Sequence, residues 1–171
     1  MARKAARKPV MEVRPDECQV RWLIRRDMDE VCSIERRSYD QPWSEEEFLG
    51  CLRQRNCIGT VIELGQRVYG FMVYELHGNK LVLLNLAVDP EYRRTGLGGR
   101  MVQRLIDKLS QQRRRDIECE IRDSNLAAQL FFQRLGFRAV RVLRNRFPED
   151  REDAYLFRYR LPVEAKISGE G

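Results

Sequence analysis

Residues 83–100 read Leu-Leu-Asn-Leu-Ala-Val-Asp-Pro-Glu-Tyr-Arg-Arg-Thr-Gly-Leu-Gly-Gly-Arg. The first six form an apolar run with the length of a buried strand, and Asp89 and Pro90 end it. A basic, glycine-rich turn follows. Beyond the turn, apolar residues recur on one face of a helix, at Met101, Val102, Leu105, Ile106 and Leu109. The pattern therefore predicts a strand, a glycine turn and a helix in direct succession.

The glycine turn has the features of a phosphate site. Glycine lets backbone N–H groups approach an anion closely, and a helix N-terminus offers unpaired donors and a positive dipole. Arginines add positive charge at positions 93, 94 and 100. The spacing Arg-x-x-Gly-x-Gly matches neither the GxGxxG of a dinucleotide site nor the GKS/T of a P-loop. The alternative is that these glycines only form a turn before an ordinary helix.

The composition is that of a single globular domain. The chain has 171 residues, 43% hydrophobic and 34% charged, which is enough for one sizeable core. No apolar run approaches the ~20 residues of a membrane span, and the N-terminus lacks the apolar segment of a signal peptide. We therefore expect a soluble, cytoplasmic protein without membrane contact.

The cysteines and the one histidine do not suggest a metal site or a nucleophile. Five cysteines are scattered without a CxxC pair, and His77 is the only histidine. Buried free thiols in a reducing cytosol explain the cysteines better. We expect no bound metal and a solvated His77 in a turn.

Positive charge is concentrated at the N-terminus. Of the net charge of +6, residues 1–10 supply four basic residues and no acid, 4 − 0 = +4. We expect residues 1–17 to form a basic, flexible tail and residues 163–171 a loose C-terminal tail. A basic tail is usually only solvated, and the alternative is a weak contact with the ribosome or RNA.

The rest of the chain alternates strands and helices. Periodicity predicts strands at 20–25, 58–64, 68–76, 83–88, 117–122, 140–143 and 155–161. Helices are predicted at 28–37, 44–52, after the glycine turn and at 126–135, with a Ser44–Glu47 capping box, a Trp43–Phe48 staple and Gly136 as the last stop. The order β-α-α-β-β-β-α-β-α-β-β indicates an α/β or α+β fold with a mixed sheet flanked by helices.

The Arg-x-x-Gly-x-Gly turn between strand and helix resembles the acyl-CoA-binding motif of the GNAT N-acetyltransferases, and the element order over residues 20–161 is similar to theirs. Within that family, further stretches resemble the bacterial ribosomal-protein-alanine N-acetyltransferases: residues 41–44 (QPWS), 85–90 (NLAVDP), 120–125 (EIRDSN), 135–137 (LGF) and 151–154 (REDA). The resemblance implies one GNAT domain over residues 18–162, with a mostly antiparallel sheet.

The resemblance also implies a site and a co-substrate, acetyl-CoA. Backbone groups are expected to hold acetyl-CoA at Leu86, Ala87 and Val88. The turn expected to cradle its pyrophosphate consists of Arg93, Arg94, Thr95, Gly96, Leu97, Gly98 and Gly99. Asn125 is expected to touch the pantetheine arm, and Glu120 to act as the general base. From the residues alone, Glu120 is better explained as half of a surface pair beside Arg122.

One position departs from the family pattern. The tyrosine that serves these relatives as general acid is Phe132 here, and the paired tyrosines of the next loop are replaced by Arg146 and Phe147. Phenylalanine cannot donate a proton. A thiol with a pKa of about 8.5 is nevertheless a tolerable leaving group, and a lost general acid is worth ~10²–10⁴ in rate.

These features predict an enzyme that moves the acetyl group of acetyl-CoA to a protein N-terminal α-amine, by direct attack in a ternary complex. The resemblance points to the N-terminal alanine of a ribosomal protein. Such an amine has a pKa of about 7.7–8.0, so it needs a general base far less than a lysine side chain with a pKa near 10.4. Two alternatives remain: an acetyltransferase for lysine side chains or small amines, and a non-catalytic acetyl-CoA-binding module on the ribosome or RNA.

Overall fold

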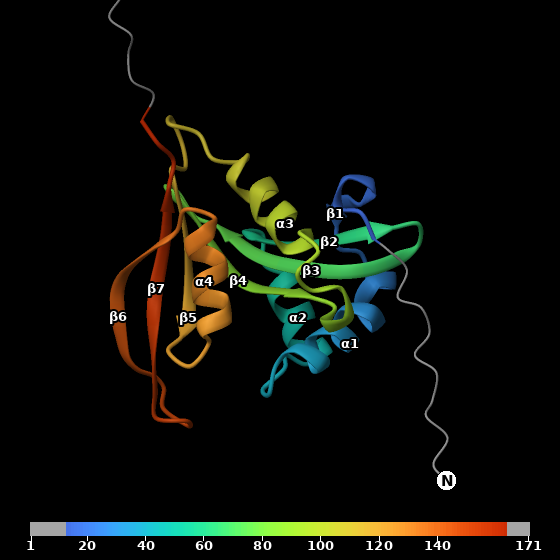
Figure 1. Cartoon of the computed structure of the whole chain (residues 1–171), viewed down its shortest axis with the longest axis horizontal. Helices are drawn as coiled ribbons and strands as arrows, with labels where there is room; N and C mark the ends of the chain where they lie inside the picture. The colour runs from blue at the N-terminus through green and yellow to red at the C-terminus, as the bar shows by residue number, and fades with distance from the viewer. Residues whose placement is uncertain (1–12, 164–171) are drawn as a thin grey trace, which may run out of the picture.

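A seven-stranded sheet forms the centre of the protein. The computed structural model describes residues 13–163, so the predictions for residues 1–12 and 164–171 lie outside the described residues. The strand order is β1-β2-β3-β4-β5-β7-β6 (Figure 1). The strands are β1 (Gln19–Trp22), β2 (Cys57–Leu64), β3 (Arg67–Leu76), β4 (Lys80–Val88), β5 (Asp116–Arg122), β6 (Arg138–Phe147) and β7 (Glu152–Arg160). Only β4 and β5 pair in parallel among these strands, which confirms the predicted mixed, mostly antiparallel sheet.

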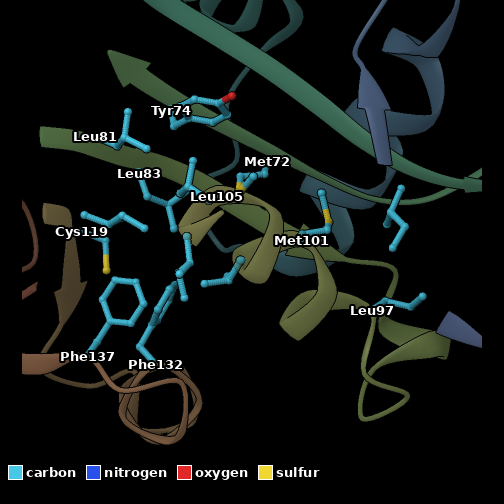
Figure 2. Packing of buried hydrophobic residues seen from close by; sticks show 14 of the residues in the cluster. Met72, Tyr74, Leu81, Leu83, Leu97, Met101, Leu105, Cys119, Phe132 and Phe137 are labelled. Atoms are coloured by element: carbon cyan, nitrogen blue, oxygen red, sulfur yellow. The ribbon is translucent and has the colours of Figure 1, made fainter. Parts of the chain in front are cut away.

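Helices cover both faces of the sheet. They are α1 (Met28–Ser38), α2 (Glu45–Leu52), α3 (Leu97–Ile106) and α4 (Leu126–Arg134). Short 3₁₀ turns precede β1 at Pro15–Glu17, α1 at Arg25–Asp27 and the glycine turn at Pro90–Tyr92. One buried cluster lies between α1, α2 and the sheet, around Phe48 and Phe71. The larger cluster lies on the other face, where Met101 and Leu105 of α3 meet β-strand residues such as Met72 (Figure 2). The predicted order of helices and strands is confirmed.

The predicted helix boundaries are explained by local contacts. Ser44 Oγ accepts the Glu47 N–H at 3.2 Å, and Glu47 Oε2 accepts the Ser44 N–H at 2.7 Å, so α2 begins with a capping box. The Trp43 and Phe48 rings lie edge-on with centroids 5.2 Å apart. Gly136 follows α4 with φ +92°, a conformation that side chains disfavour.

Several boundaries differ from the sequence predictions, and β4 and β7 each begin three residues earlier, at Lys80 and Glu152. β6 runs from Arg138 to Phe147, longer than the predicted 140–143, because pairing with β7 continues past two register shifts. The first five residues of β6 are exposed, so no alternation of buried and exposed residues marks the start of this edge strand in the sequence. β1 ends at Trp22, because a 3₁₀ turn begins at Arg25. α3 ends at Ile106, although Leu109 beyond it is still buried.

The residues before β1 also differ from the expected tail. Val13 is 6% exposed and belongs to the larger cluster, and Pro15–Glu17 form a 3₁₀ turn. Pro15 Cγ lies 3.3 Å from where a Cβ on Gly96 would be. Residues 13–17 therefore pack against the domain rather than forming part of a flexible tail.

Candidate active site

The candidate site lies where β4 and β5 separate. Their parallel pairing runs only from Lys80–Asp116 to Leu83–Cys119, whereas β4 continues to Val88 and β5 to Arg122. Because no register pairs the ends of these two strands, the sheet opens between them. The motif residues at the end of β4 and the Glu120 side of β5 flank this opening.

Two β4 residues turn their backbone polar groups into the opening. The Asp89 N–H donates to the Tyr69 carbonyl at 2.8 Å, so in an antiparallel ladder the pairs Met72–Leu86 and Gly70–Val88 are the non-hydrogen-bonded ones. The N–H and C=O of Leu86 and Val88 therefore point away from β3, towards β5. Exposed donors of this kind are suited to bind a carbonyl oxygen or an amide.

The carbonyls at the opening are held by Tyr39, directly after α1, and by Arg93 of the turn before α3. The Tyr39 hydroxyl donates to the Leu86 carbonyl, and the Arg93 Nε donates to the Val88 carbonyl at 3.3 Å. Burial of the Tyr39 hydroxyl, together with nearby Glu35, raises the pKa of Tyr39 to about 12, so it remains a donor at neutral pH. These bonds fix the carbonyl groups of Leu86 and Val88, and the N–H groups of the same two residues face the opening.

Tyr39→Phe tests this bond. Removing the hydroxyl leaves the Leu86 carbonyl without its donor, and we expect the free energy of unfolding to fall by about 1 kcal/mol. Urea unfolding followed by circular dichroism measures the change. Tyr159→Phe is the control, because the Tyr159 ring packs against Phe137. Equal stability of wild type and Tyr39→Phe would show that the Tyr39 bond adds nothing.

The α1–α2 connection is anchored to the same stretch of β4. Glu35 is 1% exposed, and it accepts the Trp43 N–H at 2.8 Å and the Asn85 Nδ2 at 3.2 Å. Burial raises the pKa of Glu35, while these two donors oppose the rise. A carboxylate with both donors in place therefore ties Trp43, at the start of α2, to the strand that lines the opening.

The glycine turn lies at the end of β4, at the N-terminus of α3. Gly96 is the N-cap with φ +93°, and Arg94 also has a positive φ of 66°. The first hydrogen bond of the helix joins the Arg100 N–H to the Gly96 carbonyl at 3.0 Å, so the N–H groups before Arg100 have no intrahelical acceptor. This end of α3 can therefore bind an anion.

The turn packs against both β4 and α4. A Cβ on Gly98 would lie 3.3 Å from Phe131 Cζ and 3.6 Å from Val88 Cγ2, so only a residue without a side chain leaves this space open. Thr95 Oγ1 donates to the Tyr92 carbonyl at 2.6 Å and holds the turn from within. The Leu97 side chain is buried, so only its backbone faces the turn.

Asp89 fixes the turn to α1. Its carboxylate is 3% exposed and accepts two bonds from Arg37, at 2.8 and 3.1 Å, with Arg67 at 3.4 Å. Burial alone would raise the pKa of Asp89, but Arg37 and the Glu91 N–H hold it below its ordinary value. Arg67 also lies over the Tyr69 and Tyr92 rings, which completes the support beneath the turn.

Glu120 lies on β5 beyond the last β4–β5 pair. Its carboxylate forms an ion pair with the Arg146 Nε of β6, not with Arg122. Arg122 instead binds Asp150 at 2.7 Å and Glu152 at 2.8 Å. Glu120 is therefore half of an ion pair, as the alternative reading allowed, but its partner comes from a strand that the sequence did not place beside it. Its side chain is 37% exposed, so solvent or an incoming group can reach it.

The neighbouring carboxylate of β5 is structural. Glu118 is 6% exposed, although strand alternation placed it on the same face as Glu120. It accepts bonds from Lys80 at 2.6 Å and from Arg158 at 2.7 Å. Burial alone would raise the pKa of Glu118, but these two cations hold it below its ordinary value. The carboxylate available for chemistry on this strand is thus Glu120.

Asn125 and Phe132 lie on the α4 side of the opening. The Asn125 Oδ1 accepts the Ala128 N–H at 3.1 Å and caps α4, so only its amide nitrogen remains for a ligand. Phe132 is 6% exposed and lies edge-on to Phe131 and Phe137, at 5.0 and 5.1 Å. Figure 2 shows Phe132 and Phe137 side by side below Cys119 of β5. The position of the family tyrosine is thus occupied by a core side chain.

The structure brings most predicted site residues to this one opening. Leu86, Val88, Gly96 and Gly98 surround its β4 side, while the Ala87 side chain belongs to the cluster beneath α1 and α2. Arg93 binds the Val88 carbonyl and, at 3.0 Å, Ser38 Oγ. Tyr39, Glu35 and Asn85 were not predicted as site residues from the sequence. The bond from Asn85 to Glu35 spans 50 residues and the bond from Tyr39 to Leu86 spans 47, so no local pattern reveals them.

Further features of the described residues concern metal ligands, membrane-spanning helices and His77. Within residues 13–163 no group of three or more His, Cys, Asp or Glu side chains is placed to hold a metal ion. In the same range no helix has the length and apolar character to cross a membrane. His77 lies in a partly exposed turn, where its Nε2 is 2.8 Å from Glu75 Oε2, and it contributes no contact to the site described above.

Comparisons with known proteins agree with this fold. The model of the acetyltransferase (GNAT) family matches residues 19–137. The [ribosomal protein bS18]-alanine N-acetyltransferase of Escherichia coli (strain K12) is 33% identical over 139 residues, which are 80% of this chain and 92% of the relative. A putative enzyme of the same name from Bacillus subtilis is 26% identical over 138 residues.

Solved structures give the same result. The ribosomal-protein-S18-alanine N-acetyltransferase from Escherichia coli superposes with a TM-score of 0.76 at 27% identity, covering 88% of this chain and 97% of that one. Arabidopsis thaliana NAA60 in complex with acetyl-CoA gives 0.73 at 17% identity, covering 84% and 99%, which shows the fold alone.

The fold, the open β4–β5 edge and the glycine turn define an N-acetyltransferase. This chain belongs to the acetyltransferase (GNAT) family, and it is an acetyl-CoA-dependent enzyme with acetyl-CoA as co-substrate. The alternative of a non-catalytic module is therefore set aside.

Proposed function

We propose that this N-acetyltransferase acetylates the α-amine of a protein N-terminus, an N-terminal alanine of a ribosomal protein. The observation that carries the proposal is the 33% identity, over 80% of the chain, to a relative named for that reaction. The exposed carboxylate of Glu120 beside the opening supports it. An α-amine with a pKa of about 7.7–8.0 is partly neutral at pH 7, so a single carboxylate acting through water suffices as base.

The residues of the opening divide the work of binding. Acetyl-CoA supplies the acetyl group as an activated thioester. We assign its pyrophosphate to the glycine turn, where Gly96, Gly98 and Gly99 present backbone N–H groups and Arg94 adds charge. Asn125 offers its amide nitrogen to the pantetheine arm. The Leu86 N–H faces the developing oxyanion. The bond from the Tyr39 hydroxyl to the Leu86 carbonyl holds this part of β4 in place.

The proton of the amine goes to Glu120. As the new N–C bond forms and the C–S bond breaks, Glu120 accepts the proton directly or through one water. Arg146, now bound to Glu120, must share this carboxylate with the acceptor amine. Phe132 provides no proton, so the thiolate leaves unaided and is protonated by solvent, which a thiol pKa of about 8.5 permits.

The acceptor is tested with three synthetic peptides and mass spectrometry. One begins with a free alanine, the second has its N-terminus blocked and carries an internal lysine, and the third has both ends blocked and no lysine. We expect acetylation of the first alone. Faster acetylation of the lysine peptide would contradict the proposal and favour a side-chain acetyltransferase.

Phe132→Tyr tests the missing general acid. Because the ring is nearly buried between two phenylalanines, the added hydroxyl is useful only if the ring edge faces the opening. We expect preserved or higher turnover and a new falling limb of the pH–rate profile near about pH 10. A drop in Tm without any gain in turnover would show that the ring edge faces the core. A falling limb already present in the wild type would mean that another tyrosine donates the proton.

Deleting residues 2–10 tests the basic tail. The deletion removes the excess of four positive charges and keeps Val13, which is buried in the core. We expect unchanged turnover on the alanine peptide. If the tail contacts RNA, ribosome binding in a sedimentation assay becomes weaker and less dependent on salt. Equal binding by both proteins at every salt concentration would remove the tail from the proposal.

A further inference from the structure

Two cysteine thiols meet at the end of α2. Cys51 is the last residue but one of α2, and Cys57 is the first residue of β2. Their sulfur atoms lie 2.7 Å apart, and all five cysteines of the chain are free thiols. A disulfide bond is about 2.05 Å long, so a small movement of either side chain is enough to form one.

The backbone between the two cysteines brings them together. The Gln54 N–H donates to the Cys51 carbonyl at 3.0 Å, and the Cys57 N–H donates to the Gln54 carbonyl at 3.1 Å. These two consecutive turns reverse the chain within six residues. The Asn56 carbonyl is in turn bound by the Leu76 N–H of β3 at 2.7 Å. The contact between the sulfurs is therefore built into the main chain rather than left to flexible side chains.

The two thiols differ in accessibility. Cys57 is 6% exposed, and burial together with the Cys51 thiol raises its pKa. Cys51 is only partly buried, and arginines follow it in the sequence at positions 53 and 55. Glu75 is paired with Cys57 across β2 and β3 and is the acidic group facing it. An external oxidant thus reaches Cys51 first, and Cys57 is the partner in contact with it.

We propose that Cys51 and Cys57 form a reversible intramolecular disulfide in reaction with a hydroperoxide. The Cys51 thiolate attacks the terminal peroxide oxygen and the O–O bond breaks, which gives a sulfenic acid and releases hydroxide from hydrogen peroxide or alkoxide from an organic hydroperoxide. The Cys57 sulfur then attacks the sulfenic sulfur, the S–S bond forms, and hydroxide leaves. With hydrogen peroxide, two thiols are oxidised to one disulfide, and the peroxide is reduced to two waters that carry the two thiol protons.

The other cysteines provide the contrast. Cys18, Cys32 and Cys119 are buried, and among residues 13–163 no other pair of cysteine sulfurs is in contact. The new bond ties the end of α2 to β2. It forms without acetyl-CoA or an acceptor, so the proposal stands or falls independently of the proposed function.

The test uses the full-length protein and hydrogen peroxide in small molar excess. After alkylation of the remaining thiols, we expect the free thiols to fall from five to three, 5 − 2 = 3. Trypsin cuts at Arg53 and Arg55, so the peptides that hold Cys51 and Cys57 are separated unless a disulfide joins them. The linked pair is expected with the mass of both peptides less two hydrogen atoms, and dithiothreitol is expected to release them.

Serine variants give the matched controls. Cys51→Ser and Cys57→Ser are expected to lose the linked pair of peptides. Cys32→Ser is expected to keep it, and it is a matched control because Cys32 is as buried as Cys57 and lies in the same cluster. Five remaining thiols, sulfinic acid at Cys51 without a link, or a link between two molecules would each overturn the proposal. If a serine variant does not fold, the peptide map of the wild type still decides.

Discussion

Gly96→Glu is expected to abolish acetyl-CoA binding while leaving the sheet intact. Gly96 is the N-cap of α3 and has φ +93°, so its replacement puts a negative side chain where we place the pyrophosphate. Contact between like charges costs several kcal/mol, and each 1.4 kcal/mol is a factor of ten, so the Kd should rise at least about 100-fold. Isothermal titration calorimetry with acetyl-CoA measures the change.

The strain of the substitution requires a control of its own. Gly65→Glu places the same side chain at another positive φ, +64°, in the β2–β3 hairpin, where no atom lies within 4 Å of the new Cβ. We expect this variant to bind acetyl-CoA normally. Unchanged affinity in a folded Gly96→Glu protein would remove the glycine turn from the binding site.

Glu120→Gln is expected to lower kcat at pH 6.5 by ~10²–10⁴, the usual worth of a general base. Glutamine keeps the size of the side chain and loses the proton acceptor. As the pH rises above about 8, the α-amine loses its own proton, so much of the deficit should disappear. A pH–rate profile with the alanine peptide shows both effects, and binding of acetyl-CoA should not change.

Arg146→Gln separates a base from a surface ion pair. It breaks the same contact with Glu120 but leaves the carboxylate in place. If Glu120 is the base, we expect this variant to have a kcat within about a factor of ten of the wild type, because the amine no longer competes with Arg146 for the Glu120 carboxylate. If both variants lose little and equally at pH 6.5, Glu120 is only half of an exposed pair, which is worth ~0–1 kcal/mol.

Local physics made much of the fold predictable. Helix α2 begins at a capping box whose two bonds join residues three apart, and Gly136 stops α4 because its own φ is positive. Strand β5 is visible because alternate residues enter one core. By contrast, β6 is an edge strand with five exposed residues at its start, and no pattern of burial marks where it begins.

The candidate site divides in the same way. Gly96, Gly98 and the arginines lie within a few residues of each other, so the turn and its charge were readable from the chain. The partner of Glu120 was not, because β7 lies between β5 and β6 and the ion pair joins residues 26 apart. The bond from Tyr39 to Leu86 likewise spans 47 residues.

The sequence by itself determined the strand, the glycine turn, the helix and the order of the elements around them. These features depend on backbone conformation and on periods of two or 3.6 residues, which neighbouring residues set. Only the tertiary structure decided that β4 and β5 separate after Leu83, that Arg146 binds Glu120, and that Cys51 meets Cys57. Sheet order, register and close packing of distant segments govern these contacts, and no local pattern encodes them.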